Sequence, residues 1–364
     1  MGGADAGPAE AAARFPCGKC GADLLYDPRA RGLRCPFCGE VRGVDAGGAV
    51  VEKDLEDALR AAAAAHEARP APASEGRRVD CGACGATVVV PPAEKAGRCP
   101  YCGSVRVLEE APDRSRIPPE CVVPFGVDRV AAEGLFRRWI RSLWFRPNAL
   151  RGAHALAEMR GLLVPYWTFD ARAESSWTAM AGYHYYVTVG TGKNRTTVRR
   201  TRWEPAAGRR RDFHDDLLVC ASRGLDGGLA AKIEPFDLAG LVPFRREYLA
   251  GWAAEAYGVD VREAWGRAEE AIRAAQEERC AGDVPGDTRS DLAVSTTLSG
   301  RKYRLALLPV WVSAYRYRGK AFRFLVNGQT GEVQGEAPLS WVKIGLLVLG
   351  IAAAVAAILL LAGG

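Results

Sequence analysis

The N-terminal residues lack the run of large apolar side chains that a secretory signal needs. They read MGGADAGPAEAAA, and no apolar core precedes Cys17. Structural disulfides belong mainly to exported proteins. We therefore expect the cysteines of this chain to be metal-binding thiolates rather than disulfides.

A phosphate-binding loop is missing as well. The segment GTGK at 190–193 resembles the end of G-x-x-x-x-G-K-[ST], but Val187 stands at the first glycine position and Asn194 follows the lysine. We predict a hairpin turn here instead, between strands over 183–189 and 196–203. No ATPase or helicase activity is expected.

No set of acid, base and nucleophile converges anywhere in the sequence. His214, Asp215 and Asp216 are adjacent, and neighbours on a strand point to opposite faces, so we do not expect them to form a catalytic or metal site. The chain is predicted not to be an enzyme, with no catalytic residues and no bound organic cofactor.

The positive charge is modest and unevenly placed. The net charge is +6, yet residues 1–120 carry 16 Lys and Arg against 18 Asp and Glu, which argues against phosphate binding there. The segment 193–211 holds eight Lys and Arg against Glu204 alone. Three interpretations remain open for it: a solvated hairpin, a contact with anionic lipid, or a nucleic-acid patch.

Eight cysteines form two copies of one pattern, CxxC, a gap of 14 residues, and CxxC. They are Cys17, Cys20, Cys35 and Cys38 in the first copy, and Cys81, Cys84, Cys99 and Cys102 in the second. Four soft thiolates suit one tetrahedral zinc ion and leave no open position, so we predict two structural zinc ions. Glycine after the second cysteine of each pair provides the positive φ that such a knuckle needs.

These patterns divide the chain into several units. We predict zinc ribbons, which are small β modules, over 14–48 and 77–112, with a helix and linker over 49–76 between them. A mixed α+β domain with an antiparallel sheet follows over 119–340. Because metal binding stands in for a core in small modules, we expect Cys35→Ser to unfold the first ribbon alone. The local patterns within the α+β domain predict helices over 130–145, 249–257 and 261–280, and strands over 162–177, 183–189, 196–203, 292–298, 303–317 and 321–326.

The C-terminal segment is apolar. Residues Ile344 to Ala362 carry no polar or charged side chain, and Trp341 and Lys343 precede them as interfacial residues. This pattern predicts a transmembrane tail anchor over 342–364, because a helix of about 20 residues crosses a bilayer. The predicted location is the bacterial inner membrane, crossed once, with the N-terminus in the cytoplasm.

The motifs together resemble a family. They are the two ribbons, VPF near Val123, W-x-x-x-x-W-F from Trp139, VPYWTFDA from Val164, GWAAEAY from Gly251, LLPVWVSAYRYRGK from Leu307 and VNGQTGEVQGEAP from Val326. The chain is similar to bacterial TFIIB-type zinc ribbon-containing membrane proteins, which often carry the label primosomal protein N′ or superfamily II helicase. The resemblance implies a recruiting or scaffolding role beside phage-shock-type and SPFH-domain proteins in membrane stress.

The function expected from the sequence is a non-enzymatic adaptor that gathers cytoplasmic proteins at the membrane. A nucleic-acid-binding zinc-ribbon protein tethered to the membrane is the alternative.

Overall fold

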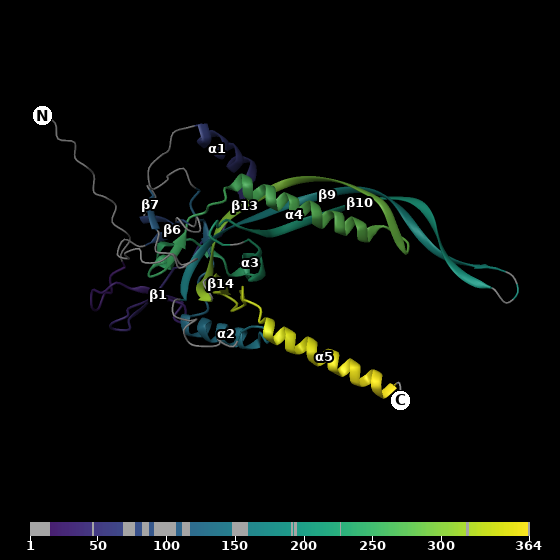
Figure 1. The fold of residues 1–364 in the computed structure, drawn as a ribbon. Coiled ribbons are helices and arrows are strands. Elements are labelled where there is room, and N and C mark those ends of the chain that lie inside the picture. Colours follow the sequence, from purple (N-terminus) through teal and green to yellow (C-terminus); the bar gives the residue numbers. More distant parts are fainter. Residues whose placement is uncertain are drawn as a thin grey trace.

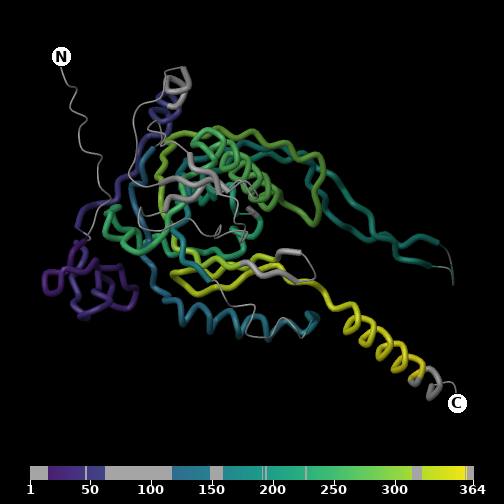
Figure 2. Tube along the Cα trace, turned by 60° about the vertical axis from the view of Figure 1, so that its left-hand side comes forward, coloured from purple at the N-terminus to yellow at the C-terminus, as the bar shows by residue number. Residues whose placement is uncertain are grey.

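Three very long strands form the centre of the protein. The computed structural model describes residues 15–45, 47–67, 77–81, 87–90, 107–110, 117–147, 159–190, 192, 195–225, 227–317 and 320–362. Strand β9 (Arg160–Val189) pairs antiparallel with β10 (Thr196–Cys220) on one side and with β13 (Thr288–Tyr317) on the other. Figures 1 and 2 show these strands curving together along the length of the molecule.

Shorter strands extend this arrangement into one 12-stranded sheet. After β13 come β14 (Lys320–Asn327) and β15 (Val333–Gly335), which together with β4 (Lys53–Asp54), β8 (Cys121–Val122), β11 (Val242–Pro243) and β12 (Ala253–Glu255) are six of the nine shorter strands. Strand β12 pairs parallel with β9, and β8 pairs parallel with β13. The sheet is therefore mixed, although its longest pairings are antiparallel.

Helix α4 (Val261–Asp283) covers the face of the three long strands (Figure 1). It begins where the Asp260 carboxylate accepts a hydrogen bond from the Glu263 backbone at 2.8 Å, a regular N-cap. Its buried residues, Trp265 and Ile272 among them, pack against Trp167 and Phe169 of β9. The helix thus buries one face of a sheet that would otherwise be solvated.

The other helices lie around the sheet. Helix α2 (Arg129–Ser142) buries Phe136, whose ring stacks on Phe324 of β14 with centroids 3.7 Å apart. The remaining helices are α1 (Leu55–Glu67), α3 (Gly227–Lys232), α5 (Trp341–Ala362) and the 3-10 turns η4 (Leu238–Gly240) and η5 (Arg246–Leu249). Helix α5 extends away from the body in both views (Figures 1 and 2).

The fold-class prediction is wrong in its balance of helix and strand, because the described chain is mostly β-sheet. Segments predicted as separate strands, 162–177 and 183–189, form one continuous strand, β9. The helix predicted over 249–257 is also absent. Gly251 has a φ of 81°, which ends helical geometry, and β12 then pairs with β9 and β6 (Thr87–Val90).

The predicted second ribbon contributes strands to the same sheet. Strand β5 (Arg77–Cys81) pairs with β6 on one side and with β7 (Val107–Glu110) on the other, and β6 joins the main sheet through β12. This segment is therefore connected to the sheet by backbone hydrogen bonds. Cys84, Cys99 and Cys102 lie outside the described residues, as does the side chain of Cys81.

The membrane prediction is contradicted. Among the residues that the structure describes, none of the helices combines the length and the hydropathy needed to span a bilayer. The predicted tail anchor over 342–364, the membrane as partner and the single-pass inner-membrane location are not supported.

Candidate metal centre

Four cysteines predicted as metal ligands come together in the structure. The Sγ atoms of Cys17, Cys20, Cys35 and Cys38 all lie within 4.8 Å of one another. The Cys17–Cys38 and Cys20–Cys35 pairs are each separated by 3.4 Å, too far apart for a disulfide. Tetrahedral zinc with Zn–S distances of 2.3 Å requires sulfurs about 3.8 Å apart, so the group can hold such an ion. It is the one cluster with metal-ligand geometry in the described parts of the chain.

The backbone around the two cysteine pairs follows the same path twice. The Cys17 N–H donates to Ala22 O and the Cys35 N–H to Glu40 O, each at 2.8 Å. Gly21 and Gly39 then take φ values of 72° and 74°, which only glycine adopts without strain. The spacing and the two glycines thus encode a pair of matching knuckles, as the sequence predicted.

Amide groups in these knuckles favour thiolates. The Cys38 N–H lies 3.5 Å from Cys35 Sγ, and this backbone contact lowers the pKa of Cys35 to about 6. The backbone of Cys20, together with that of Lys19, lowers the pKa of Cys17. The first cysteine of each pair therefore has a lowered pKa, whereas hydrogen bonds between the sulfurs raise the pKa of Cys20 and raise that of Cys38 to about 12.

The ribbon formed by these residues is fixed to the rest of the protein. Its three-stranded sheet, β1 (Leu25–Asp27), β2 (Gly32–Arg34) and β3 (Val41–Gly43), turns Tyr26 and Leu33 inward, where both are buried. The Tyr26 ring meets the Tyr248 ring edge-on at 5.4 Å, and the Trp252 indole donates to Tyr26 O at 3.0 Å. Cys17 and Cys35 thus share one core cluster with residues of the main sheet.

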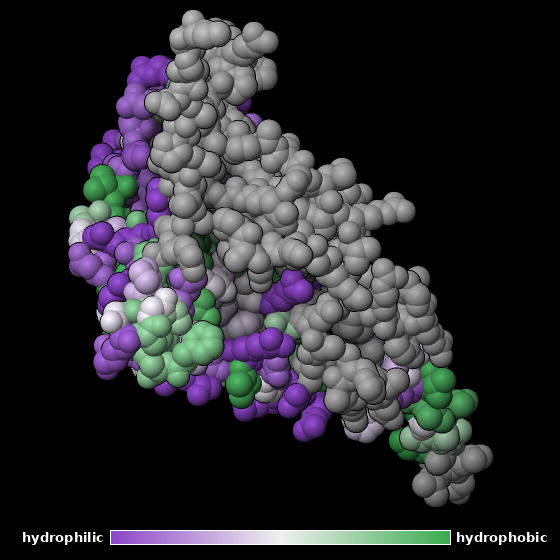
Figure 3. Space-filling model, turned by 90° about the vertical axis from the view of Figure 1, so that its left-hand side faces the viewer, coloured by the Kyte–Doolittle hydropathy of each residue, from purple (hydrophilic) through white to green (hydrophobic). Residues whose placement is uncertain are grey.

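The opposite face of the ribbon is open to solvent. Leu25, Arg34 and Val41 pair across the three strands and so share this face, and all three are exposed. The tip of the second knuckle exposes 82% of Phe37. Figure 3, which faces the side of the molecule where β1 lies, shows apolar patches here among polar surface.

The other three cysteines whose side chains the structure describes take no part in the cluster. Cys121 and Cys280 are buried, and Cys220 is half-buried. Burial raises the pKa of Cys121 and that of Cys220 to about 12, so both stay protonated.

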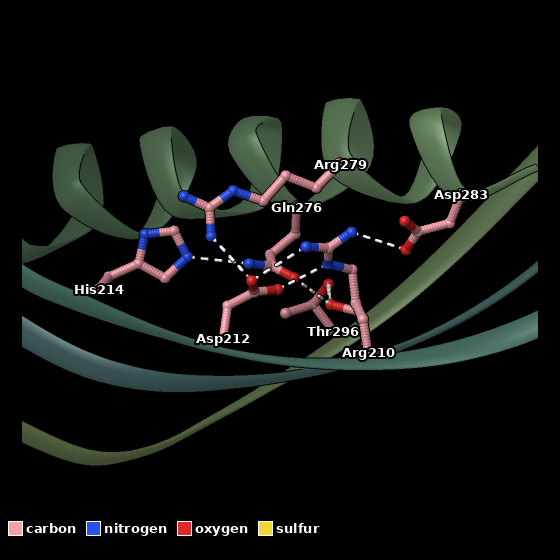
Figure 4. Close-up of polar contacts among 8 residues, drawn as sticks. Arg210, Asp212, His214, Gln276, Arg279, Asp283 and Thr296 are labelled. Carbon is pink, nitrogen blue, oxygen red and sulfur yellow. Dashed lines mark hydrogen bonds and ion pairs between the residues drawn. The ribbon is translucent and has the colours of Figure 1, made fainter.

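A network of buried polar side chains lies under α4 (Figure 4). The sequence patterns did not predict it. Gln276 of α4 is fully buried, and its amide N–H donates to His214 Nε2 at 2.9 Å. The Ser175 hydroxyl donates to Gln276 Oε1 at 2.9 Å and contacts Thr296 Oγ1 at 2.8 Å. Burial, together with the Arg279 cation, lowers the pKa of His214 and keeps the ring neutral.

The neighbouring acids of the His214 segment point elsewhere. A bulge follows His214, and Asp216 takes a φ of 52°, so its backbone N–H reaches Asp170 Oδ1 at 2.8 Å. Burial, and then the adjacent Glu52 carboxyl, raise the pKa of Asp170 to about 6. His214 and Asp216 therefore join different polar groups and form no common site.

Comparisons with known proteins place this chain in a family. No family model matches it, and no solved structure matches it. One curated protein, "Uncharacterized protein YdjG" of Bacillus subtilis (strain 168), is 30% identical over 240 residues, which cover 64% of this chain and 68% of that protein. With that identity over more than two thirds of the relative's length, the chain belongs to the same family as YdjG of Bacillus subtilis.

Proposed function

We propose that this protein is a non-enzymatic adaptor that binds other proteins through its first ribbon. The observation that carries the proposal is the combination of a four-thiolate cluster with an exposed aromatic side chain beside it. Four sulfurs complete a tetrahedral ion and leave no position for a substrate, so the cluster fits a structural role. Phe37, fixed between two of the ligands and 82% exposed, has the character of an interface anchor.

The way the ribbon is mounted supports the same proposal. Its inner face is held by Tyr26, Leu33 and the Trp252 hydrogen bond, while its outer face carries the exposed Leu25 and Val41. A docking surface that is rigid before binding loses little conformational entropy when a partner arrives. An ion in the cluster would fix the second knuckle and hold Phe37 in one position.

We also propose that the ion is zinc and that Cys81, Cys84, Cys99 and Cys102 hold a second one. Metal analysis of freshly purified protein should then give close to two zinc ions per chain. Cys35→Ser should reduce this to one, since it removes a ligand from the first set only. A wild-type value of one or zero would contradict the second site or both sites.

The adaptor role can be tested by replacing the exposed aromatic side chain. Crosslinking in cells should connect the wild-type protein to one or more specific proteins, and Phe37→Ala should abolish these crosslinks without changing zinc content. Phe213→Ala is the matched control, because Phe213 is another phenylalanine with 57% exposure, located on β10. Its crosslinks should equal those of the wild type.

Candidate partners follow from the resemblance noted in the sequence, namely phage-shock-type and SPFH-domain proteins. Recovery of such a protein should survive nuclease treatment and should be repeated when the partner is used as bait. Equal crosslinking by Phe37→Ala and Phe213→Ala would count against the first ribbon as the docking surface.

A further inference from the structure

The far end of the β9–β10 pair forms an arm that stands alone. The pairing between β9 and β13 ends at Gly182 and Thr288, whereas β9 and β10 remain paired out to Val189 and Thr196. Beyond Gly182 the described sheet is therefore only two strands wide, and Figure 1 shows it extending past the end of α4. We call the described residues of these two strands, 183–190 and 195–203, the arm.

Three tyrosines on one strand of the arm stand opposite three arginines on the other. The register pairs Tyr183 with Arg202, Tyr185 with Arg200 and Tyr186 with Arg199. Directly opposed side chains lie on the same face of a sheet, so each cation stands beside an aromatic ring. The Arg202 guanidinium lies 5.8 Å from the centre of the Tyr183 ring.

These side chains are open to solvent. Tyr185 is 44% exposed and Tyr186 is 69% exposed, and the three arginines are exposed as well. Strand neighbours alternate between faces, so Tyr185 and Arg200 occupy one face while Tyr186 and Arg199 occupy the other. Nothing in the described core requires aromatic groups at these positions, because the arm has no sheet or helix packed over it.

The charge of the arm selects an anionic partner. Its described residues contain four arginines and no Asp or Glu, and the next residue, Glu204, pairs with Arg202 at 2.9 Å. A second copy of the same arm would be repelled by this charge. An acidic peptide would satisfy the arginines but has no flat face for the rings, and bases in a duplex are already stacked on one another.

We propose that the arm binds single-stranded nucleic acid on both of its faces: phosphates on Arg200 and Arg202 with a base stacked on Tyr185 on one face, and a phosphate on Arg199 with a base stacked on Tyr186 on the other. Adjacent cations and exposed rings are the two elements that such binding uses, and each base has a face that can stack on tyrosine. This surface is separate from the first ribbon, so the inference goes beyond the adaptor role.

Fluorescence anisotropy of the full chain with a labelled oligothymidine of about 20 nucleotides tests the proposal. Three phosphate contacts predict a salt slope near −2, which is a loss of affinity of roughly twentyfold between about 0.05 and 0.2 M salt. A variant with Arg199→Gln, Arg200→Gln and Arg202→Gln should bind at least ~10-fold more weakly and with little salt dependence. Tyr185→Ala with Tyr186→Ala should weaken binding at least ~5-fold while keeping the salt slope.

The matched control removes the same charge from another exposed surface. Arg137→Gln, Arg138→Gln and Arg141→Gln change three exposed arginines on α2 and should leave oligothymidine binding as in the wild type. Equal weakening by the α2 and arm variants would overturn the proposal, since binding would then follow net charge alone. Displacement of the oligonucleotide by an equally charged poly-glutamate peptide, or preference for a duplex, would also overturn it.

Discussion

Loss of the first metal centre should destabilise the main sheet as well as the ribbon. Leu24, Tyr26 and Leu33 are at most 5% exposed and belong to the same core cluster as Tyr248 and Ala254. Burying such a side chain contributes about 1.5–3 kcal/mol, so freeing the three would remove up to about 5–9 kcal/mol. The unfolding free energy of a whole domain is only about 5–15 kcal/mol. We therefore expect loss of the metal centre to destabilise the main sheet too, and not to unfold the ribbon alone.

Hydrogen–deuterium exchange of Cys35→Ser measures this coupling directly. Protection should fall in peptides covering 24–33 and also in those covering 248–255, where Trp252 donates to Tyr26 O. Cys220→Ala is the control, because it removes a thiol outside the cluster and should leave the 24–33 peptide protected. If the ribbon exchanged freely while 248–255 kept wild-type protection, the two would be independent and this reasoning would be refuted.

Three further changes test the interior of the sheet. Burial raises the pKa of Asp170 from the ordinary 3.8 to about 6, so the folded state binds this proton more tightly than the unfolded state does. The free energy of unfolding therefore falls as the pH rises from 3.8 to 6. Asp170→Asn cannot ionise, so it should remove this fall and stabilise the protein above pH 6 by up to about 3 kcal/mol in denaturant titrations. Gln276→Leu removes the hydrogen bonds that the buried Ser175 and His214 make with the Gln276 amide and should cost about 2–4 kcal/mol. Unchanged stability would show that the network under α4 contributes nothing. Gly161→Ala would place a methyl group against the Trp252 ring and should cost about 1–3 kcal/mol, whereas Gly134→Ala in the open middle of α2 should stabilise by up to ~1 kcal/mol; the opposite order of melting temperatures would contradict this packing.

Local sequence determined the features that depend on near neighbours. The CxxC spacing and the glycines after Cys20 and Cys38 encode two knuckles, because a backbone turn needs only its own few residues. The hairpin turn after Val189 follows in the same way and is confirmed by the register. Helices over 129–142 and 261–283 match their predicted positions closely, since each has an apolar stripe and an aspartate at its N-cap.

Tertiary structure decided where these pieces lie and how far the strands run. The continuity of β9 comes from backbone hydrogen bonds to two partner strands, which outweigh the local breaks in its side-chain pattern. Pairing with β9 and β6 draws residues 253–255 into the sheet in place of a predicted helix. Gln276 and His214, 62 residues apart, meet only because α4 packs on the curved sheet. Hydrogen bonding and burial between distant segments leave no periodicity in the chain, so only the folded protein reveals them.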